Sequence, residues 1–150
     1  MARMTIAALA IAASAGIALA AVTGAEAIKE RRALMKTDGE VSKPIVPMLK
    51  GKAPFDLAIV QKALKAYENA ASKEPALFPP DSKTGGTNAL PAIWEDNNMA
   101  DLDARFKKMG DDAAAALVSV KDEASFKAIM PGFYDNNCGG CHEKYKAKQQ

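Results

Sequence analysis

Apolar side chains recur at every third or fourth position along most of the chain, which is the spacing of one face of an α-helix. The two clearest stripes are Ile59, Val60, Ala63, Leu64 and Tyr67, and then Met99, Leu102, Phe106, Met109, Ala113 and Leu117. β-branched residues are few, and strict alternation of apolar and polar positions never holds for long. The pattern therefore predicts an all-α protein.

The first predicted helical segment covers residues 23–50, and a second helix follows it. Gly39 lowers helix propensity, and Pro44 and Pro47 each lack a backbone donor, so we expect the first segment to be interrupted. Asp56 has a side chain that caps helix N-termini, and it directly precedes the second stripe. We therefore expect the second helix to begin there.

A long connection follows, because residues 73–91 are rich in Pro, Gly, Ser, Thr and Asn. Loops of this length are usually functional or held by their own side chains, and Leu77, Phe78 and Trp94 are the candidate anchors. A third helix is predicted over residues 95–120.

The fourth predicted helix begins at Asp122, with Pro131 as an expected bend. Its inward side chains are expected to be Phe126, Ile129 and Phe133. Four amphipathic helices with mostly short connections predict an antiparallel four-helix bundle.

Residues 1–20 combine one basic residue, Arg3, with a short run of Ala, Ile and Leu, which is the pattern of a secretory signal peptide. Cleavage at the end of this stretch is favoured over cleavage after Ala27. The later cut would remove Thr23 and Glu26, which have the T-x-x-E spacing of a helix capping box. An uncleaved membrane anchor is the alternative. The sequence thus predicts export to the periplasm and one mature domain, residues 21–150.

The composition excludes several classes of protein. The 150 residues are 49% hydrophobic, with a formal net charge of +2, so neither disorder nor a broad basic surface for nucleic acid is expected. Two cysteines are too few for a disulfide-dense scaffold, and one histidine is too few for a histidine-rich metal site.

Those three residues form the motif Cys138-Gly139-Gly140-Cys141-His142. On a helix, residues three and four apart share one face, so both thiols can form thioethers to a porphyrin edge while the imidazole reaches the iron. The two glycines add no bulk where the macrocycle lies against the backbone. The motif predicts one covalently attached haem c, with His142 as an axial iron ligand.

Three other interpretations of the motif are weaker. A structural zinc site needs four ligands, and no second Cys/His cluster exists. A thioredoxin-like C-x-x-C requires a βαβ setting, and a disulfide across two residues of a helix would constrain almost nothing.

A sixth iron ligand would have to come from upstream, and no second histidine exists. Thioether sulfur is an alternative ligand of haem iron. The methionines that remain after signal removal are Met35, Met48, Met99, Met109 and Met130. Met99 and Met109 continue the apolar stripe of the third helix, Met130 is too close along its own helix, and Met48 lies beyond two prolines. Met35 is left by elimination.

Several stretches of the chain together resemble the cytochrome c-prime family, the class II c-type cytochromes. Besides the haem motif with the following Glu143-Lys144-Tyr145, they are Ile28-Lys29-Glu30-Arg31-Arg32-Ala33-Leu34-Met35-Lys36, Lys52-Ala53-Pro54-Phe55-Asp56, Leu77-Phe78-Pro79-Pro80 and Pro91-Ala92-Ile93-Trp94.

The resemblance implies roles for two residues of the first helix. The position matching Met35 is bulky and does not bind iron in the five-coordinate, gas-binding members, but is an iron-bound methionine in the six-coordinate, low-spin branch. Arg31 matches an arginine that contacts a haem propionate. The family's first helix commonly continues where this chain has Pro44 and Pro47, so we expect the helix to break soon after Met35.

The leading functional prediction is single-electron transfer by a monohaem cytochrome with His142 and Met35 as axial ligands, in contact with redox partner proteins. The alternative is a five-coordinate cytochrome that binds NO or CO. A peroxidase would require a distal histidine or arginine, and no residue set suggests acid–base catalysis, so no enzyme is predicted. No stable membrane insertion after signal removal is expected, and a homodimer remains open.

Overall fold

The computed structural model describes residues 22–148, and these residues form a bundle of helices. The α-helices are α1 (Gly24–Ser42), α2 (Ile45–Leu49), α3 (Leu57–Lys73), α4 (Asn98–Ser119), α5 (Glu123–Phe133) and α6 (Gly140–Tyr145). Short 3₁₀-helices are η1 (Glu74–Leu77), η2 (Pro80–Ser82) and η3 (Pro91–Trp94), and η4 (Tyr134–Gly139) is a π-helical segment that joins α5 to α6. The predicted signal peptide lies outside the described residues.

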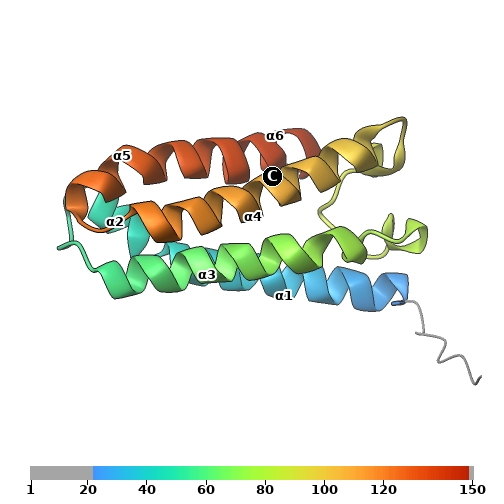
Figure 1. Cartoon of the computed structure of the whole chain (residues 1–150). Helices are drawn as coiled ribbons and strands as arrows, with labels where there is room; N and C mark the ends of the chain where they lie inside the picture. The colour runs from blue at the N-terminus through green and yellow to red at the C-terminus, as the bar shows by residue number, and fades with distance from the viewer. Residues whose placement is uncertain (1–21, 149–150) are drawn as a thin grey trace, which may run out of the picture.

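The four long elements are α1, α3, α4 and the composite α5–η4–α6, and successive elements run in opposite directions (Figure 1). In that view α1 runs from right to left, α3 returns, α4 runs left again and the last element returns to the right. The prediction of an antiparallel four-helix bundle is confirmed. None of the described helices is long and apolar enough to cross a membrane.

Three predicted helix starts are confirmed by their caps. The Thr23 hydroxyl accepts from the Glu26 backbone N–H while the Glu26 carboxylate accepts from the Thr23 backbone, which completes the capping box. Asp56 accepts from two backbone N–H groups of α3, and Asp122 accepts from the Ser125 N–H of α5. Each cap satisfies helix donors that would otherwise lack partners.

The first helix is longer than predicted. It does not break soon after Met35 but continues through Gly39 to Ser42, and the chain turns only before Pro44. The cost of one glycine in a helix is about 1 kcal/mol, which packing of α1 against α3 can offset. Pro47 lies inside the short helix α2 rather than ending the segment.

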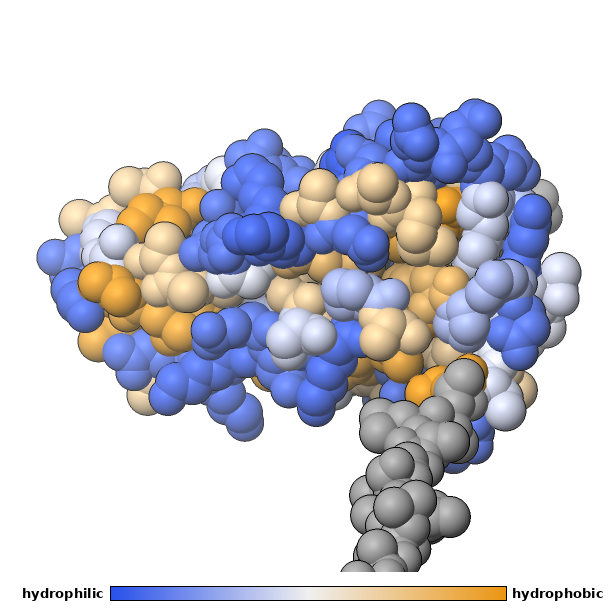
Figure 2. All heavy atoms as spheres, turned by 45° about the vertical axis from the view of Figure 1, so that its right-hand side comes forward, coloured by the Kyte–Doolittle hydropathy of each residue, from blue (hydrophilic) through white to orange (hydrophobic). Residues whose placement is uncertain are grey.

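The core is a continuous apolar cluster to which every long helix contributes. Phe126 and Phe133 are buried as predicted, whereas Ile129 is only half-buried and Met130 takes the inner position instead. Pro131 is accommodated within α5. Figure 2 shows hydrophilic residues over much of one face, with apolar atoms exposed between them.

The connection between α3 and α4 is held by its own side chains, as predicted. Leu77 and Phe78 are buried, and the indole of Trp94 donates to the Phe78 carbonyl over 3.0 Å. The same connection is hydrogen-bonded to the last residue of α6, because the Leu90 N–H donates to the Tyr145 carbonyl over 2.9 Å. The loop therefore fixes the position of α6.

Candidate cofactor site

A cavity of about 650 Å³ lies inside one part of the bundle. All five predicted site residues are on its wall, namely Arg31, Met35, Cys138, Cys141 and His142. Apolar side chains make up much of the rest, among them Phe78, Ile93, Leu102, Phe106 and Met109. A smaller hollow of about 350 Å³ between α4 and α5 contains none of the five.

The haem-type motif does not lie on a uniform α-helix, contrary to the sequence-based expectation. Cys138 belongs to the π-helical η4, whereas Cys141 and His142 belong to α6. The Gly140 N–H donates to the Asp135 carbonyl five residues earlier, as in a π-turn. The wider turn changes the register between the two thiols, yet both reach the same cavity.

The two glycines of the motif are not required by protein packing. A Cβ at Gly139 would meet nothing closer than 3.7 Å, and one at Gly140 nothing closer than 3.6 Å. Both distances are ordinary van der Waals contacts. Glycine at these positions therefore does not relieve a clash within the protein.

Both thiols are free and half-buried. Burial, reinforced by the carboxylate of Asp38, raises the pKa of Cys138 to about 11, and burial also raises the pKa of Cys141. Reactive redox cysteines have the opposite property, a lowered pKa. The site therefore differs from that of a thiol oxidoreductase.

His142 lies beside them with part of its ring open to solvent. Loss of surrounding water lowers its pKa, and the nearby charge of Lys146 acts in the same direction. The neutral imidazole, which is the form that binds metals, is thus favoured.

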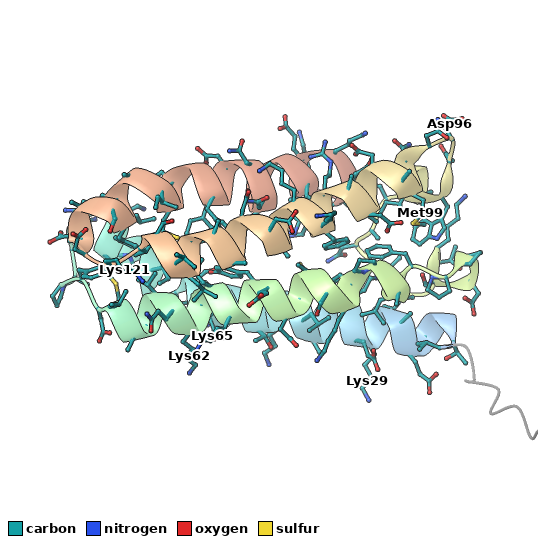
Figure 3. All side chains as sticks on the ribbon, in the orientation of Figure 1. Lys29, Lys62, Lys65, Asp96, Met99 and Lys121 are labelled. Atoms are coloured by element: carbon teal, nitrogen blue, oxygen red, sulfur yellow. The ribbon has the colours of Figure 1, made fainter. Side chains whose placement is uncertain are left out.

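Within residues 22–148, two methionines lie on the wall of this cavity. Met35 from α1 is half-buried on its wall, and Met109 from α4 is buried beside it. Met48 and Met130 are buried elsewhere in the core, and Met99 lies at the start of α4 at the loop end of the bundle (Figure 3). The prediction that Met109 packs in the core is confirmed, although its place on the cavity wall was not foreseen.

Arg31 is buried, with 5% of its surface exposed, so it does not lie on a solvated helix face. Both terminal nitrogens donate to the loop between α3 and α4: Nη1 to the Leu77 carbonyl and the Ser82 hydroxyl, Nη2 to the Ser82 carbonyl and the Thr87 hydroxyl. The guanidinium also lies 4.5 Å from the centroid of the Phe78 ring. Arg31 therefore joins α1 to this loop at the edge of the cavity.

The orientation of α6 is set by Asp101 of α4. Its carboxylate accepts from Arg105 over 2.8 Å, from Lys144 over 3.1 Å and from the Tyr145 hydroxyl. These bonds hold the pKa of Asp101 well below its usual range. Asp101 thus serves as a structural hydrogen-bond acceptor between α4 and α6.

One buried and one half-buried acid on the cavity wall were not found from the sequence. Glu74 is 1% exposed, and burial raises its pKa to about 8; burial likewise raises the pKa of Asp38 to about 7. A hydroxyl pair also lines the cavity, because Tyr67 lies 2.8 Å from Tyr134 through their oxygens. No local pattern marks these residues, since each is brought to the cavity by packing between helices.

A four-helix bundle with two thiols, an imidazole and an apolar cavity together defines a haem-binding bundle of the c type. The sequence profile described as "Cytochrome C'" matches residues 26–146. The chain belongs to the cytochrome c′ family, whose members bind one covalent haem c, and the predicted cofactor is confirmed at this level.

Individual relatives carry different names. A cytochrome c′ of Rhodopseudomonas palustris is 50% identical over 130 residues, covering 86% of this chain and 87% of the relative. A cytochrome c-556 of Agrobacterium fabrum is 34% identical over 129 residues, covering 86% of each. The solved structure of the R. palustris cytochrome c′ aligns with a TM-score of 0.77 over 83% of this chain and 98% of that one.

The residues present fit a haem c. Two free thiols and an imidazole lie on the wall of one mostly apolar cavity, and buried carboxyl oxygens of Asp38 and Glu74 on that wall lack hydrogen-bond partners. Among the described residues, no group of three or more His, Cys, Asp or Glu side chains could hold a metal ion.

Proposed function

We propose that the protein is a periplasmic monohaem electron carrier in which Cys138 and Cys141 hold the haem and His142 and Met35 bind its iron. The single observation that carries this proposal is the position of Met35 and His142 on the wall of the same cavity. Met35 comes from α1 and His142 from α6, which belong to different long elements of the bundle (Figure 1). When bound, haem iron supplies one-electron cycling between its ferric and ferrous forms.

The protein's own residues would tune and shield that site. The apolar side chains of Phe78, Phe106 and Leu102 exclude water, which strengthens electrostatic effects within the cavity. A Met35 thioether bound to the iron would raise its reduction potential relative to a second histidine ligand. Both terminal nitrogens of Arg31 already donate to the loop. A contact with a haem propionate at the cavity edge would therefore have to use its Nε–H.

A five-coordinate, gas-binding cytochrome is the second candidate. The observation in its favour is that the 50% identical relative is named cytochrome c′, whereas the cytochrome c-556 relatives are 31–34% identical. In that case the half-buried Met35 would fill the space beside the iron without binding it.

The start of the described structure favours the earlier of the two predicted cleavage sites. The Thr23–Glu26 capping box begins α1, the Gly24 N–H donates to the Asp81 carboxylate over 2.8 Å, and Ala27 is fully buried. Cleavage after Ala27 would remove these contacts. We therefore propose that cleavage follows Ala20.

Redox partner proteins are proposed to approach the cavity mouth. Arg32, Lys36 and Lys146 are exposed residues of the cavity lining, and neither acid of that lining is fully exposed. These three basic residues favour a partner with an acidic surface, because opposite charges speed the encounter of two proteins. Added salt screens this attraction and weakens it. Electron-transfer rates that fall with ionic strength would support this orientation.

The test is the optical spectrum of the purified ferric holoprotein. We expect a low-spin spectrum with the far-red charge-transfer band of a methionine–iron bond, and we expect Met35→Ala to abolish that band. Met109→Ala is the matched control, because Met109 lies on the same cavity wall and should leave the band in place. A high-spin spectrum that Met35→Ala leaves unchanged would support the gas-binding candidate. Loss of the band in Met109→Ala alone would show that Met109 is the ligand.

A further inference from the structure

Glu74 is a buried acid that the proposed ligation does not use. It is the first residue of η1, it lies on the cavity wall, and 1% of its surface is exposed. Its Oε1 has no hydrogen-bond partner; within residues 22–148 only Asp38 Oδ1 shares this property among buried side-chain oxygens and nitrogens. Native proteins pair nearly all buried polar groups, so this carboxyl needs a functional explanation.

The titratable and charged groups on the same cavity wall as Glu74 come from several elements, and three of them, Arg31, Asp38 and Cys141, interact with its charge. The others are Arg32 and Lys36 of α1, Tyr67 of α3, Arg105 of α4, Tyr134 and Cys138 of η4, and His142, Tyr145 and Lys146 around α6. Arg31 is the cation that favours the charged form of Glu74, yet its terminal nitrogens donate to the loop instead. Arg105 is paired with Asp101. No cation in this set is bonded to the Glu74 carboxylate.

The protonation of Glu74 is consequently set by the balance of charge in the cavity. Burial raises its pKa to about 8; the positive charge of Arg31 opposes this shift, and the negative charge of Asp38 adds to it. Both protonation states are therefore accessible close to neutral pH. A single added or removed charge in the same cavity would move this equilibrium, because a low-dielectric interior screens charge weakly.

We propose that Glu74 binds a proton when the haem iron is reduced and releases it when the iron is oxidised. This inference rests on the proposed electron-transfer function. A one-electron donor protein supplies the electron to the iron, and solvent supplies the proton that forms the O–H bond on the Glu74 carboxylate. Oxidation reverses both transfers, so charge and atoms balance.

The coupling follows from thermodynamic reciprocity. Ferric iron carries one more positive charge than ferrous iron, and the extra charge favours the carboxylate over the acid. Deprotonated Glu74 must then stabilise the ferric form to the same degree. The reduction potential is therefore expected to fall as pH rises through the titration of Glu74.

The test is the midpoint potential of the holoprotein, measured by spectroelectrochemistry at pH values on both sides of 8. The wild type should show a potential that falls with pH, with a slope approaching one proton per electron. Glu74→Gln should remove that slope and hold the potential near the value that the wild type reaches at low pH. Glu68→Gln, which changes an exposed carboxyl on α3, should keep the wild-type slope.

A full slope in Glu74→Gln would overturn the assignment. If Asp38→Asn then lost the slope, the proton would be assigned to Asp38 instead. Proton uptake on reduction of the wild type, followed with a pH indicator in weak buffer, provides a test that needs no variant: absence of uptake near pH 8 excludes the coupling. Optical spectra of the same samples report iron ligation independently. A failure of the Met35 assignment can therefore be told apart from a failure of the proton coupling at Glu74.

Discussion

The guanidinium of Arg31 donates to the hydroxyl of Ser82 over 2.8 Å, a contact that joins two residues 51 positions apart in the sequence. Ser82 is fully buried, and its hydroxyl in turn donates to the Pro79 carbonyl over 2.7 Å. One side chain of α1 thereby determines the course of the loop that forms one edge of the cavity.

Replacement of Arg31 should consequently destabilise the fold. Arg31→Ala leaves buried acceptors of Leu77 and Ser82 without partners, and we expect the free energy of unfolding to fall by about 2–4 kcal/mol. Urea denaturation of the holoprotein measures this loss. Arg32→Ala is the control, because Arg32 is exposed and has one long contact of 3.5 Å; its effect should stay within about 0.5 kcal/mol. Equal effects of the two substitutions would contradict the structural role of Arg31.

The π-helical segment is tied to α4 through Asn137. The side-chain amide of Asn137 donates to the Asp112 carboxylate over 2.8 Å, and Asn137 is buried directly before Cys138. Asn137→Ala should lower the free energy of unfolding by about 1–2 kcal/mol, because it removes a hydrogen bond to a charged acceptor. The exposed neighbour Asn136 provides the comparison, and Asn136→Ala should change the denaturation midpoint little. If Asn136→Ala shifted the midpoint as much as Asn137→Ala does, the Asn137–Asp112 hydrogen bond would not be the cause of the lost stability.

The start of α1 tolerates no side chain at Gly24. A Cβ there would lie 2.4 Å from the Asp81 carbonyl oxygen, so Gly24→Ala must displace backbone, at a cost of about 1–3 kcal/mol. Gly39, inside the same helix, has nothing within 4 Å of a Cβ. Gly39→Ala should instead raise stability by up to about 1 kcal/mol, since alanine has the higher helix propensity. Thermal melts of the two variants should therefore shift in opposite directions.

Asp101 should support stability in a pH-dependent way. Its pKa is lowered in the folded state by hydrogen bonds from Arg105 and Tyr145, so its contribution is present above its usual pKa and is lost as pH falls through the folded value. We expect Asp101→Asn to cost about 0.5–1 kcal/mol at neutral pH, a small value because more than a third of the side chain is exposed and water screens its ion pairs. The difference from wild type should shrink on acidification. Asp103→Asn, a substitution on the exposed side of α4, is the control for the loss of one carboxylate from this helix.

Local chemistry made much of the fold predictable. Thr23, Asp56 and Asp122 mark helix starts because a cap is formed by side-chain and backbone groups within about four residues. The apolar stripes likewise identified Leu102 and Phe106 as inward residues, and both are buried. The motif of Cys138, Cys141 and His142 predicted the cofactor for the same reason, since its spacing is short.

Features that depend on tertiary contact were not predictable in this way. Gly39 remains helical because α1 packs on α3, although its own propensity argues for a break. The π-turn before Gly140 has no local signal, and the burial of Glu74 arises only when η1 packs against α1 and α4. Single-residue preferences are weak compared with such packing.

The loop between α3 and α4 contacts the cavity wall at two places. One is Arg31 of α1, and the other is the segment of α6 and the residues that follow it, at Tyr145 and Ala147. At the second place its links are two backbone hydrogen bonds, Leu90 to Tyr145 and Ala147 to Asn88, whereas the helices share a continuous apolar core. Segments with few buried apolar contacts open locally at lower free energy than the core. Residues 83–88 of the loop, none of which is buried, should therefore open before the segments around Phe78 and Ile93, which belong to the core, and their amides should exchange with deuterated solvent before those of the four helices.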